Sequence, residues 1–228
     1  MTKMLASVNS IAEALLVLNE QVDIIDLKQP ASGALGALPL DTVNAIVKII
    51  AGRCPISATV GDLPMHAELV FNAVQAMANT GVDYIKIGFF PNGNSIETIN
   101  KLAELSTSFK LIAVLFADTP LDLKLLAQLK QAGFMGVMLD TMNKQQGSLT
   151  KILNENQLKA FVNGAKQYSL LCGLAGSLRL TDIETLLTYQ ADYLGFRGAL
   201  CETHNRTGQL DNEAVARIRK AVTSSAIL

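Results

Sequence analysis

The sequence predicts an α/β protein built as a single-domain (βα)8 TIM barrel over residues 1–228. Short apolar runs rich in β-branched residues alternate with segments of helical period along the whole chain. Eight such runs begin about 27 residues apart on average, which is close to the repeat of a compact eight-fold barrel. No linker, charge block or low-complexity stretch interrupts the series, and the chain is long enough to bury a core.

The predicted strands are nearly continuous in apolar residues, which is typical of parallel strands that are covered on both faces. They cover residues 4–8, 22–28, 55–60, 84–88, 110–118, 136–141, 169–176 and 193–198. An open doubly wound sheet is the alternative architecture. Such a sheet normally carries a glycine-rich fingerprint in its first βα turn, and residues 6–10 contain no glycine, so the barrel is favoured.

The predicted helices carry apolar stripes with a period of 3.6 residues. They cover residues 11–18, 43–50, 70–78, 96–102, 125–129, 158–165, 183–187 and 215–222. Two start signals add detail. Pro120 after Thr119 predicts a helix that begins at the proline, and Thr181 with Glu184 predicts a capping box.

Composition excludes several classes of function. A net charge of −1 argues against a nucleic-acid-binding protein, and no apolar run or basic leader indicates a membrane span or export signal. Three scattered cysteines and two histidines predict neither a disulfide framework nor a metal site. We therefore expect a soluble cytoplasmic globular domain that works without a metal or cofactor. The helical faces are apolar enough for a modest homo-oligomer contact, but composition does not decide it.

A TIM barrel performs its chemistry at the C-terminal ends of its strands, so those ends supply the candidate residues. They are Ser7, Asp26, Lys28, Thr59, Asp62, Lys86, Asp118, Asp140 and Arg197, with Lys144 shortly after the sixth strand. Lys28 and Lys86 are the informative pair because lysine is rarely buried without a partner. An amine in an apolar pocket beside other cations has a lowered pKa, which prepares it to form a Schiff base with a carbonyl substrate.

Strand parity brings four of these residues together. Lys28, Lys86, Asp140 and Arg197 all belong to even-numbered strands, whose side chains share layers inside a barrel. The alternative is that the lysines form structural ion pairs, Lys28 with Asp26, and Lys86 with Asp83 or a neighbouring carboxylate. Lys144 lies in a polar loop and by itself is typical of a solvated surface lysine.

A phosphate site is predicted at the loops after strands 7 and 8, where barrels of this kind often bind phosphate on main-chain N–H groups. Gly176 and Ser177 form one loop, and Arg197 and Gly198 form the other. Glycines that merely end strands are the competing interpretation.

Three further features carry weaker predictions. The long loop 29–39 either closes over the substrate as a lid or is a turn with no role, and its length favours the lid. Cys201 is expected to be a buried or incidental thiol, and His66 to lie at the surface or the edge of the site.

The same residues resemble the (5-formylfuran-3-yl)methyl phosphate synthases, a family of methanofuran biosynthesis. The resemblance is carried by the stretches VDIIDLKQPASGALGA (22–37), ISATVGDLP (56–64), DYIKIG (83–88), VMLDT (137–141), LAGSL (174–178) and GFRGALC (195–201). The stretch after the second strand is the most specific of these, and the similarity runs from the first strand to the last helix.

The resemblance implies a class I, aldolase-like barrel that condenses two molecules of glyceraldehyde 3-phosphate, releasing one phosphate and water. It implies that Lys28 is the Schiff-base lysine, that Lys86 is a proton acceptor, and that Asp140 and Lys144 are catalytic. We expect the cationic neighbours of Lys86 to keep it neutral. Asp26, Gly176, Ser177, Arg197 and Gly198 are expected to bind the substrate or its phosphate. Other class I aldolases, transaldolase-like enzymes and a non-catalytic barrel that binds phosphometabolites stay open as alternatives.

Overall fold

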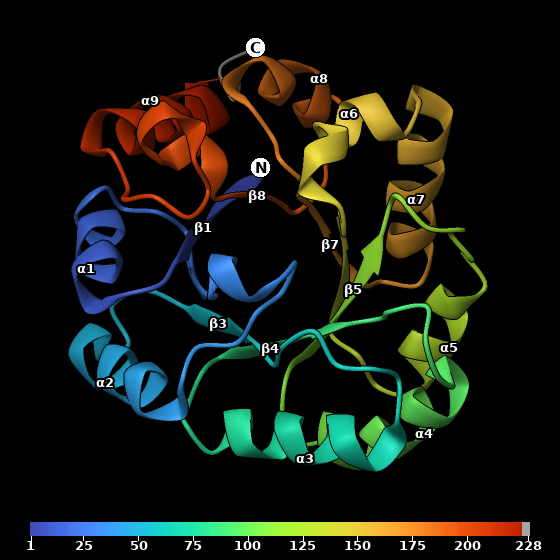
Figure 1. Ribbon diagram of the computed structural model, residues 1–228. Helices are drawn as coiled ribbons and strands as arrows, with labels where there is room; N and C mark the ends of the chain where they lie inside the picture. The colour runs from blue at the N-terminus through green and yellow to red at the C-terminus, as the bar shows by residue number, and fades with distance from the viewer. Residues whose placement is uncertain (225–228) are drawn as a thin grey trace.

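The computed structural model describes residues 1–224 and shows a closed barrel of eight parallel strands in sequence order, surrounded by helices (Figure 1). The strands are β1 (Lys3–Val8), β2 (Ile24–Leu27), β3 (Ile56–Thr59), β4 (Tyr84–Gly88), β5 (Leu111–Phe116), β6 (Gly136–Asp140), β7 (Leu171–Leu174) and β8 (Tyr193–Phe196). Each differs from its predicted range by at most two residues at either end. The predicted barrel is confirmed, and the open sheet is excluded because β1 pairs with β8.

The helices that cover the barrel follow the strands in alternation. They are α1 (Ile11–Asn19), α2 (Leu40–Ile50), α3 (Ala67–Ala78), α4 (Ser95–Ser106), α5 (Leu125–Gln131), α6 (Leu149–Ile152), α7 (Glu155–Gln167), α8 (Ile183–Leu187) and α9 (Asn212–Ser224). Within residues 1–224, no helix is both long enough and apolar enough to cross a membrane.

Side chains inside the barrel and outside it form separate apolar clusters. The inner cluster includes Leu5, Ile24, Leu35, Ile112, Val114, Phe116, Met138 and Tyr193, and the larger outer cluster packs the strands against the helices. Because side chains alternate along a strand, Ile24, Asp26 and Lys28 lie on the inner face of β2 and its extension. The inner apolar cluster is therefore the floor beneath the polar residues at the mouth, which is the C-terminal end of the barrel.

Each even-numbered strand is preceded by a turn of the same form. Three residues before β2, β4, β6 and β8 stand Gln21, Gly81, Gly133 and Gln190, all with positive φ. Before β2, β4 and β8 an aspartate follows this turn. Its carboxylate accepts a hydrogen bond from a main-chain N–H group at the start of a neighbouring odd-numbered strand. Asp83, for example, accepts from Ile56 N at 2.8 Å. This repeated turn fixes where each even-numbered strand begins along the barrel axis. It therefore also fixes the position of the side chains at the C-terminal end of that strand.

The loops after β2 and β6 share a backbone form at positions half a chain length apart. Each contains one turn of 3₁₀ helix, η1 (Pro30–Ser32) after β2 and η2 (Lys144–Gln146) after β6. Each turn is capped at its start by an amide side chain and ends at a glycine, with φ of 109° at Gly33 and 103° at Gly147. Both loops lie at the mouth, and the first one crosses the centre of the barrel (Figure 1).

Two predicted helix starts are wrong. The helix expected at Pro120 begins at Leu125, because Thr119 hydroxyl bonds back to Phe116 O and ends the strand in a turn instead. The capping box expected at Thr181 is replaced by Asp182, which accepts from Arg179 N at 2.7 Å. In both places a local side-chain hydrogen bond replaces the expected cap.

Candidate active site

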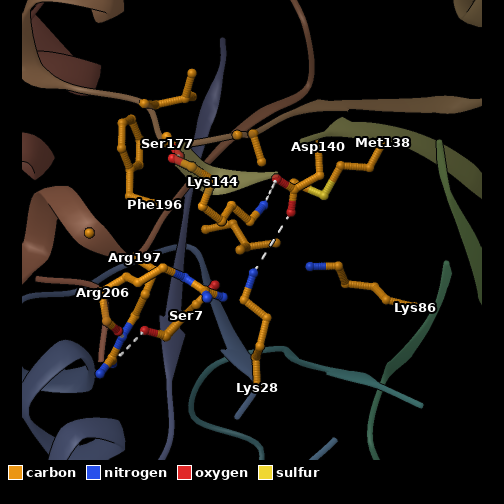
Figure 2. Close-up of a pocket in the computed structure, with 16 residues that line it drawn as sticks. Ser7, Lys28, Lys86, Met138, Asp140, Lys144, Ser177, Phe196, Arg197 and Arg206 are labelled. Carbon is orange, nitrogen blue, oxygen red and sulfur yellow. Dashed lines mark hydrogen bonds and ion pairs between the residues drawn. The ribbon is translucent and has the colours of Figure 1, made fainter. Parts of the chain in front are cut away.

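A cavity at the mouth of the barrel brings together most of the predicted site residues (Figure 2). Its lining includes Ser7, Lys28, Lys86, Met138, Asp140, Lys144, Gly176, Ser177, Leu178, Phe196, Arg197, Gly198 and Arg206. Figure 2 shows the amines of Lys28, Lys86 and Lys144 directed into this cavity from different sides. The parity argument thus holds for the four residues of the even strands.

Lys28 follows β2 directly and is buried, with 6% of its surface exposed. Its Nζ lies 3.7 Å from Asp140 Oδ2. Burial lowers the pKa of Lys28 to about 8; Asp140 opposes this shift, and the charges of Lys144 and Lys86 reinforce it. At pH 7 an amine with this pKa is neutral in about one molecule in ten, against fewer than about one in a thousand for an ordinary lysine.

Asp140 ends β6 and is held by two lysines. Lys144 Nζ donates to Asp140 Oδ1 at 2.5 Å and also to the carbonyl of Thr141, while Lys28 approaches the other carboxylate oxygen. Burial by itself would raise the pKa of Asp140, but the charges of Lys144 and Lys28 and the N–H of Thr141 hold it at about 2. The carboxylate is therefore charged at neutral pH. Lys144 is not the solvated surface lysine that its polar loop suggested, because only 15% of its side chain is exposed.

Lys86 forms an ion pair with a neighbouring carboxylate, which is one of the alternatives that the sequence left open. Its Nζ donates to Asp26 Oδ1 at 3.0 Å, so its partner is Asp26 and not Asp83. The direct contact of its amine is this carboxylate, and not one of the cationic neighbours that were expected around it. Lys86 nevertheless lines the cavity and can exchange a proton with a bound molecule there.

Asp26 lies beneath the cavity and is completely buried. It accepts hydrogen bonds from Ser7 Oγ at 2.8 Å, from Ser57 Oγ at 2.6 Å and from Lys86. Burial raises the pKa of Asp26, but the nearby lysine charges and serine hydroxyls outweigh it and the net shift is downward. The expected role in substrate binding is corrected, because Asp26 does not line the cavity and its oxygens are already occupied.

Arg197, expected to bind phosphate, uses its donors inside the protein. Its two Nη atoms form a paired contact with the Glu13 carboxylate and also donate to Ser7 O and Gly208 O. Its Nε donates to Arg206 O at 2.8 Å. An arginine has five N–H donors, so none remains for an anion. Arg197 is a brace that ties α1, β1 and the loop after β8 together.

Arg206 is a charged cavity residue that the sequence did not reveal. It lies in the loop after β8, and its Nη2 donates to Gly33 O at 2.9 Å in the loop after β2. Nothing in the local sequence distinguishes it from a surface arginine, since it follows β8 by ten residues within a polar segment. The signal that identifies it is three-dimensional.

The loop after β7 offers main-chain donors to the cavity. Gly176 has φ of 108° and approaches Thr141 so closely that a Cβ there would lie 2.7 Å from Thr141 Cγ2. Among residues 1–224, no acceptor takes the N–H groups of Gly176, Ser177 or Leu178. A row of free N–H groups beside a cavity is suited to an anion, and Gly198 faces the same space.

The loop 29–39 is fastened over the mouth. Asp62, after β3, accepts from Ala34 N at 2.8 Å and Leu35 N at 2.6 Å, and Leu35 packs with no exposed surface into the inner apolar cluster. A Cβ on Gly33 would collide with Asp62, which explains the glycine. The loop is thus anchored at its tip across the barrel mouth, but none of its residues lines the cavity, and its role as a lid stays a prediction.

Asp118 anchors the loop after β6 in the same way, since its carboxylate accepts hydrogen bonds from Met142 N and Asn143 N. The remaining candidates lie apart from the chemistry. Cys201 is buried, with burial raising its thiol pKa, and it bonds to Arg197 O. His66 is exposed at the start of α3. Thr59 is buried and bonds to Gly36 O, which fastens the loop 29–39 further.

Solved structures with the same fold are distant in sequence. Phosphoribosyl anthranilate isomerase from Thermotoga maritima superimposes with a TM-score of 0.71 at 11% identity, covering 98% of this chain and 100% of the isomerase. The corresponding isomerase from Thermus thermophilus gives 0.69 at 12% identity, covering 99% and 100%. At this level of identity the likeness shows the fold alone.

Sequence relatives are much closer. A homologue from Methylorubrum extorquens, provisionally named a (5-formylfuran-3-yl)methyl phosphate synthase, is 41% identical over 96% of this chain and 91% of its own length. The Archaeoglobus fulgidus protein named (5-formylfuran-3-yl)methyl phosphate synthase is 32% identical over 96% of this chain and 99% of its own. The family model described as 4-HFC-P synthase matches residues 4–219. The chain therefore belongs to the 4-HFC-P synthase family of enzymes.

Proposed function

We propose that the protein joins two molecules of glyceraldehyde 3-phosphate through a Schiff base on Lys28 and releases (5-formylfuran-3-yl)methyl phosphate, one phosphate and water. The observation that carries the proposal is a buried amine at the barrel mouth with a pKa lowered to about 8, among two further lysines. The names of the homologues support this product, and methanofuran biosynthesis is the pathway in which it would be used.

Lys28 supplies the covalent step. Its neutral amine attacks the aldehyde carbon of one triose phosphate, and loss of water from the carbinolamine gives an iminium ion. The iminium draws electrons from the adjacent carbon, which becomes acidic and assists departure of a phosphate from the next carbon. Addition to the second triose, ring closure and loss of water then lead to an aromatic furan, whose stability makes the final step hard to reverse.

Two lysines are placed to move protons during these steps. Lys86, held by Asp26, lines one side of the cavity, and Lys144, held by Asp140, lines another. Each can give a proton to a leaving hydroxyl or accept one from carbon, and a positioned acid or base typically contributes about 10²–10⁴-fold. Asp140 also contacts the Schiff-base lysine, so it would stabilise the cationic iminium as it forms.

The phosphate of a bound triose has a matching receptor in the loop after β7. The unpaired N–H groups of Gly176, Ser177 and Leu178 would donate to its oxygens, and the small Gly198 leaves room for them. Leu35 and the fastened lid exclude bulk water from the iminium, which would otherwise hydrolyse.

The test is to trap the covalent intermediate. Incubation with glyceraldehyde 3-phosphate and borohydride should label Lys28, identified by peptide mass spectrometry, and Lys28→Met should lose both the label and turnover. Lys48→Met, which changes an exposed lysine on α2, is the matched control and should keep both. Turnover with an unlabelled Lys28 would overturn the covalent step.

Product analysis separates the other chemistries. A furan ultraviolet absorbance together with released phosphate supports the synthase. A linear sugar phosphate would indicate a class I aldolase or transaldolase-like enzyme, and binding of the triose without any product would indicate a non-catalytic barrel. Either of these results would overturn the proposed reaction while leaving the fold and the cavity as described.

A further inference from the structure

The cations of the cavity differ in whether a carboxylate neutralises them. Lys28 and Lys144 face Asp140, Lys86 faces Asp26, and Arg197 faces Glu13. Within the part of the chain that the structure describes, Arg206 takes part in no ion pair. Among residues 1–224 its guanidinium donates to one carbonyl, that of Gly33, which leaves most of its five donors without an acceptor there.

The loop that carries Arg206 is built to hold this side chain in place. Cys201 and Leu210 bridge across its base, and Arg197 donates to Arg206 O at 2.8 Å and to Gly208 O at 2.8 Å from below. Arg197 is in turn fixed by its paired contact with Glu13, whose side chain and that of Arg197 are nearly buried. A buried ion pair therefore positions the main chain of a residue at the cavity rim.

The same loop contains an uncommon backbone conformation. Thr203 and His204 are consecutive residues with positive φ, 50° and 59°, and neither is a glycine. Each such residue costs roughly 1 kcal/mol or more, so the surrounding contacts must impose the bend. The bend turns the chain back so that Arg206 stands beside Gly198 at the cavity. Strain of this kind is concentrated at sites that bind ligands.

We propose that Arg206 is the cationic anchor for the phosphate monoester of a bound substrate, and that the Arg197–Glu13 pair positions it. This inference rests on the proposed function for the identity of the substrate as a triose phosphate. A phosphate monoester carries close to two negative charges, which neutral N–H groups of the loop after β7 do not balance. A guanidinium binds phosphate through two parallel N–H···O bonds and stays protonated at all relevant pH values.

Arg206 would also join the two loops over a bound substrate. Its Nη2 reaches Gly33 O in the fastened lid, and its other donors can reach a phosphate at the same time because the guanidinium is a planar fork. Binding energy from the phosphate, which is remote from the reacting aldehyde, would in this way help to hold the lid over the iminium.

The decisive experiment compares phosphorylated and unphosphorylated aldehydes. In Arg206→Met, the concentration of glyceraldehyde 3-phosphate that half-saturates borohydride labelling should rise about 10- to 100-fold, as expected for lost hydrogen bonds to a charged group. Labelling by glyceraldehyde, which has no phosphate, should be unchanged. Arg206→Lys should recover part of the loss because it keeps the charge but not the fork. Arg217→Met, which removes an exposed arginine of α9, is the control and should match the parent protein.

A second measurement does not depend on the chemistry at Lys28. Inorganic phosphate is titrated by calorimetry, and Arg206→Met should weaken its binding by a similar factor. If wild-type protein gives no label at Lys28 but phosphate binding still depends on Arg206, the proposed function fails and this inference stands. The inference would be overturned if the variant and the wild type were half-saturated at the same concentration of glyceraldehyde 3-phosphate. It would also be overturned if labelling by both aldehydes weakened equally, because Arg206 would then only support the loop.

Discussion

Two buried lysine–aspartate centres stand side by side at the barrel mouth and differ in their charge balance. The Lys86 centre contains one lysine and one aspartate in contact at 3.0 Å, with two serine hydroxyls bonded to the same carboxylate. The Lys28 centre contains two lysines, Lys28 and Lys144, that share Asp140, and Lys144 makes the closer contact at 2.5 Å. Lys28 is left at 3.7 Å.

The difference between the two centres lies in how many lysines share one carboxylate. Both lysines are buried to nearly the same degree, 6% exposed for Lys28 and 3% for Lys86. Burial alone therefore does not distinguish them. Burial lowers the pKa of Lys28, and a carboxylate that also serves Lys144 opposes this shift only in part, so the pKa stays at about 8. The Lys86 centre has one lysine for its carboxylate, and the Lys28 centre has two lysines for one carboxylate.

The largest expected effect comes from unbalancing the Lys86 centre. Lys86→Met leaves the Asp26 carboxylate buried without a cation, and we expect the free energy of unfolding to fall by about 3–5 kcal/mol. Urea unfolding followed by circular dichroism measures the change. The double variant Lys86→Met with Asp26→Asn should recover part of the loss because it removes the orphaned charge. A loss below about 1 kcal/mol in the single variant would show that the pair is not structurally coupled.

The opposite sign is expected at the Lys28 centre. Lys28→Met should raise the free energy of unfolding at pH 7 by up to about 3 kcal/mol, because the fold no longer holds a poorly compensated amine. The folded pKa of about 8 lies below the ordinary 10.5, so the unfolded chain binds more protons between these values. Wild-type stability should therefore rise from about pH 8 to pH 10.5, and the variant should lack that rise. A variant less stable than wild type would contradict this account.

Removing a serine tests the balance of the Lys86 centre more gently. Ser57→Ala deletes the 2.6 Å hydrogen bond to Asp26 and should cost about 1.5–3 kcal/mol, since the acceptor is charged and buried. The exposed Ser108→Ala is the matched control and should stay within about 0.5 kcal/mol of wild type. Equal melting curves for the two variants would mean that Ser57 contributes nothing to holding the carboxylate.

The smallest effect is a shift in pH dependence. Lys144→Met removes a like charge near Lys28 and returns the whole of Asp140 to it, so the pKa of Lys28 should rise by about one unit. The rate of borohydride labelling at pH 7 should then fall about 10-fold and recover above pH 9. Labelling rates report the amine of Lys28 itself, apart from any proton transfer by Lys144. An unchanged pH dependence of labelling would contradict this prediction, because it would show that the charge of Lys144 does not affect the pKa of Lys28.

The sequence predicted the fold well because periodicity and strand spacing are local properties. It also identified Lys28 and Lys86, since lysines at the ends of apolar strands stand out against their surroundings. Their partners could not be predicted, because the pairing of Lys28 with Asp140 and of Lys86 with Asp26 depends on side-chain directions across the barrel.

Arg197 and Arg206 illustrate the same limit. The contact of Arg197 with Glu13 joins residues 184 positions apart, and it turned an expected anion ligand into a brace. Arg206 gains its place from a bent loop and from the absence of a carboxylate partner among the described residues, neither of which leaves a pattern in the chain. Interactions between distant parts of the sequence decided both assignments.

The loops after β2 and β6 share their backbone form, and Asp26 and Asp140 each stand seven residues before the glycine that ends the turn. Two residues beyond each aspartate the two loops differ. One has the amine of Lys28, and the other has the thioether of Met142, which packs against the inner apolar cluster. In the proposed reaction, this exchange of nitrogen for sulfur leaves one of the two matching positions able to bond covalently to an aldehyde carbon and the other able only to pack against its surroundings.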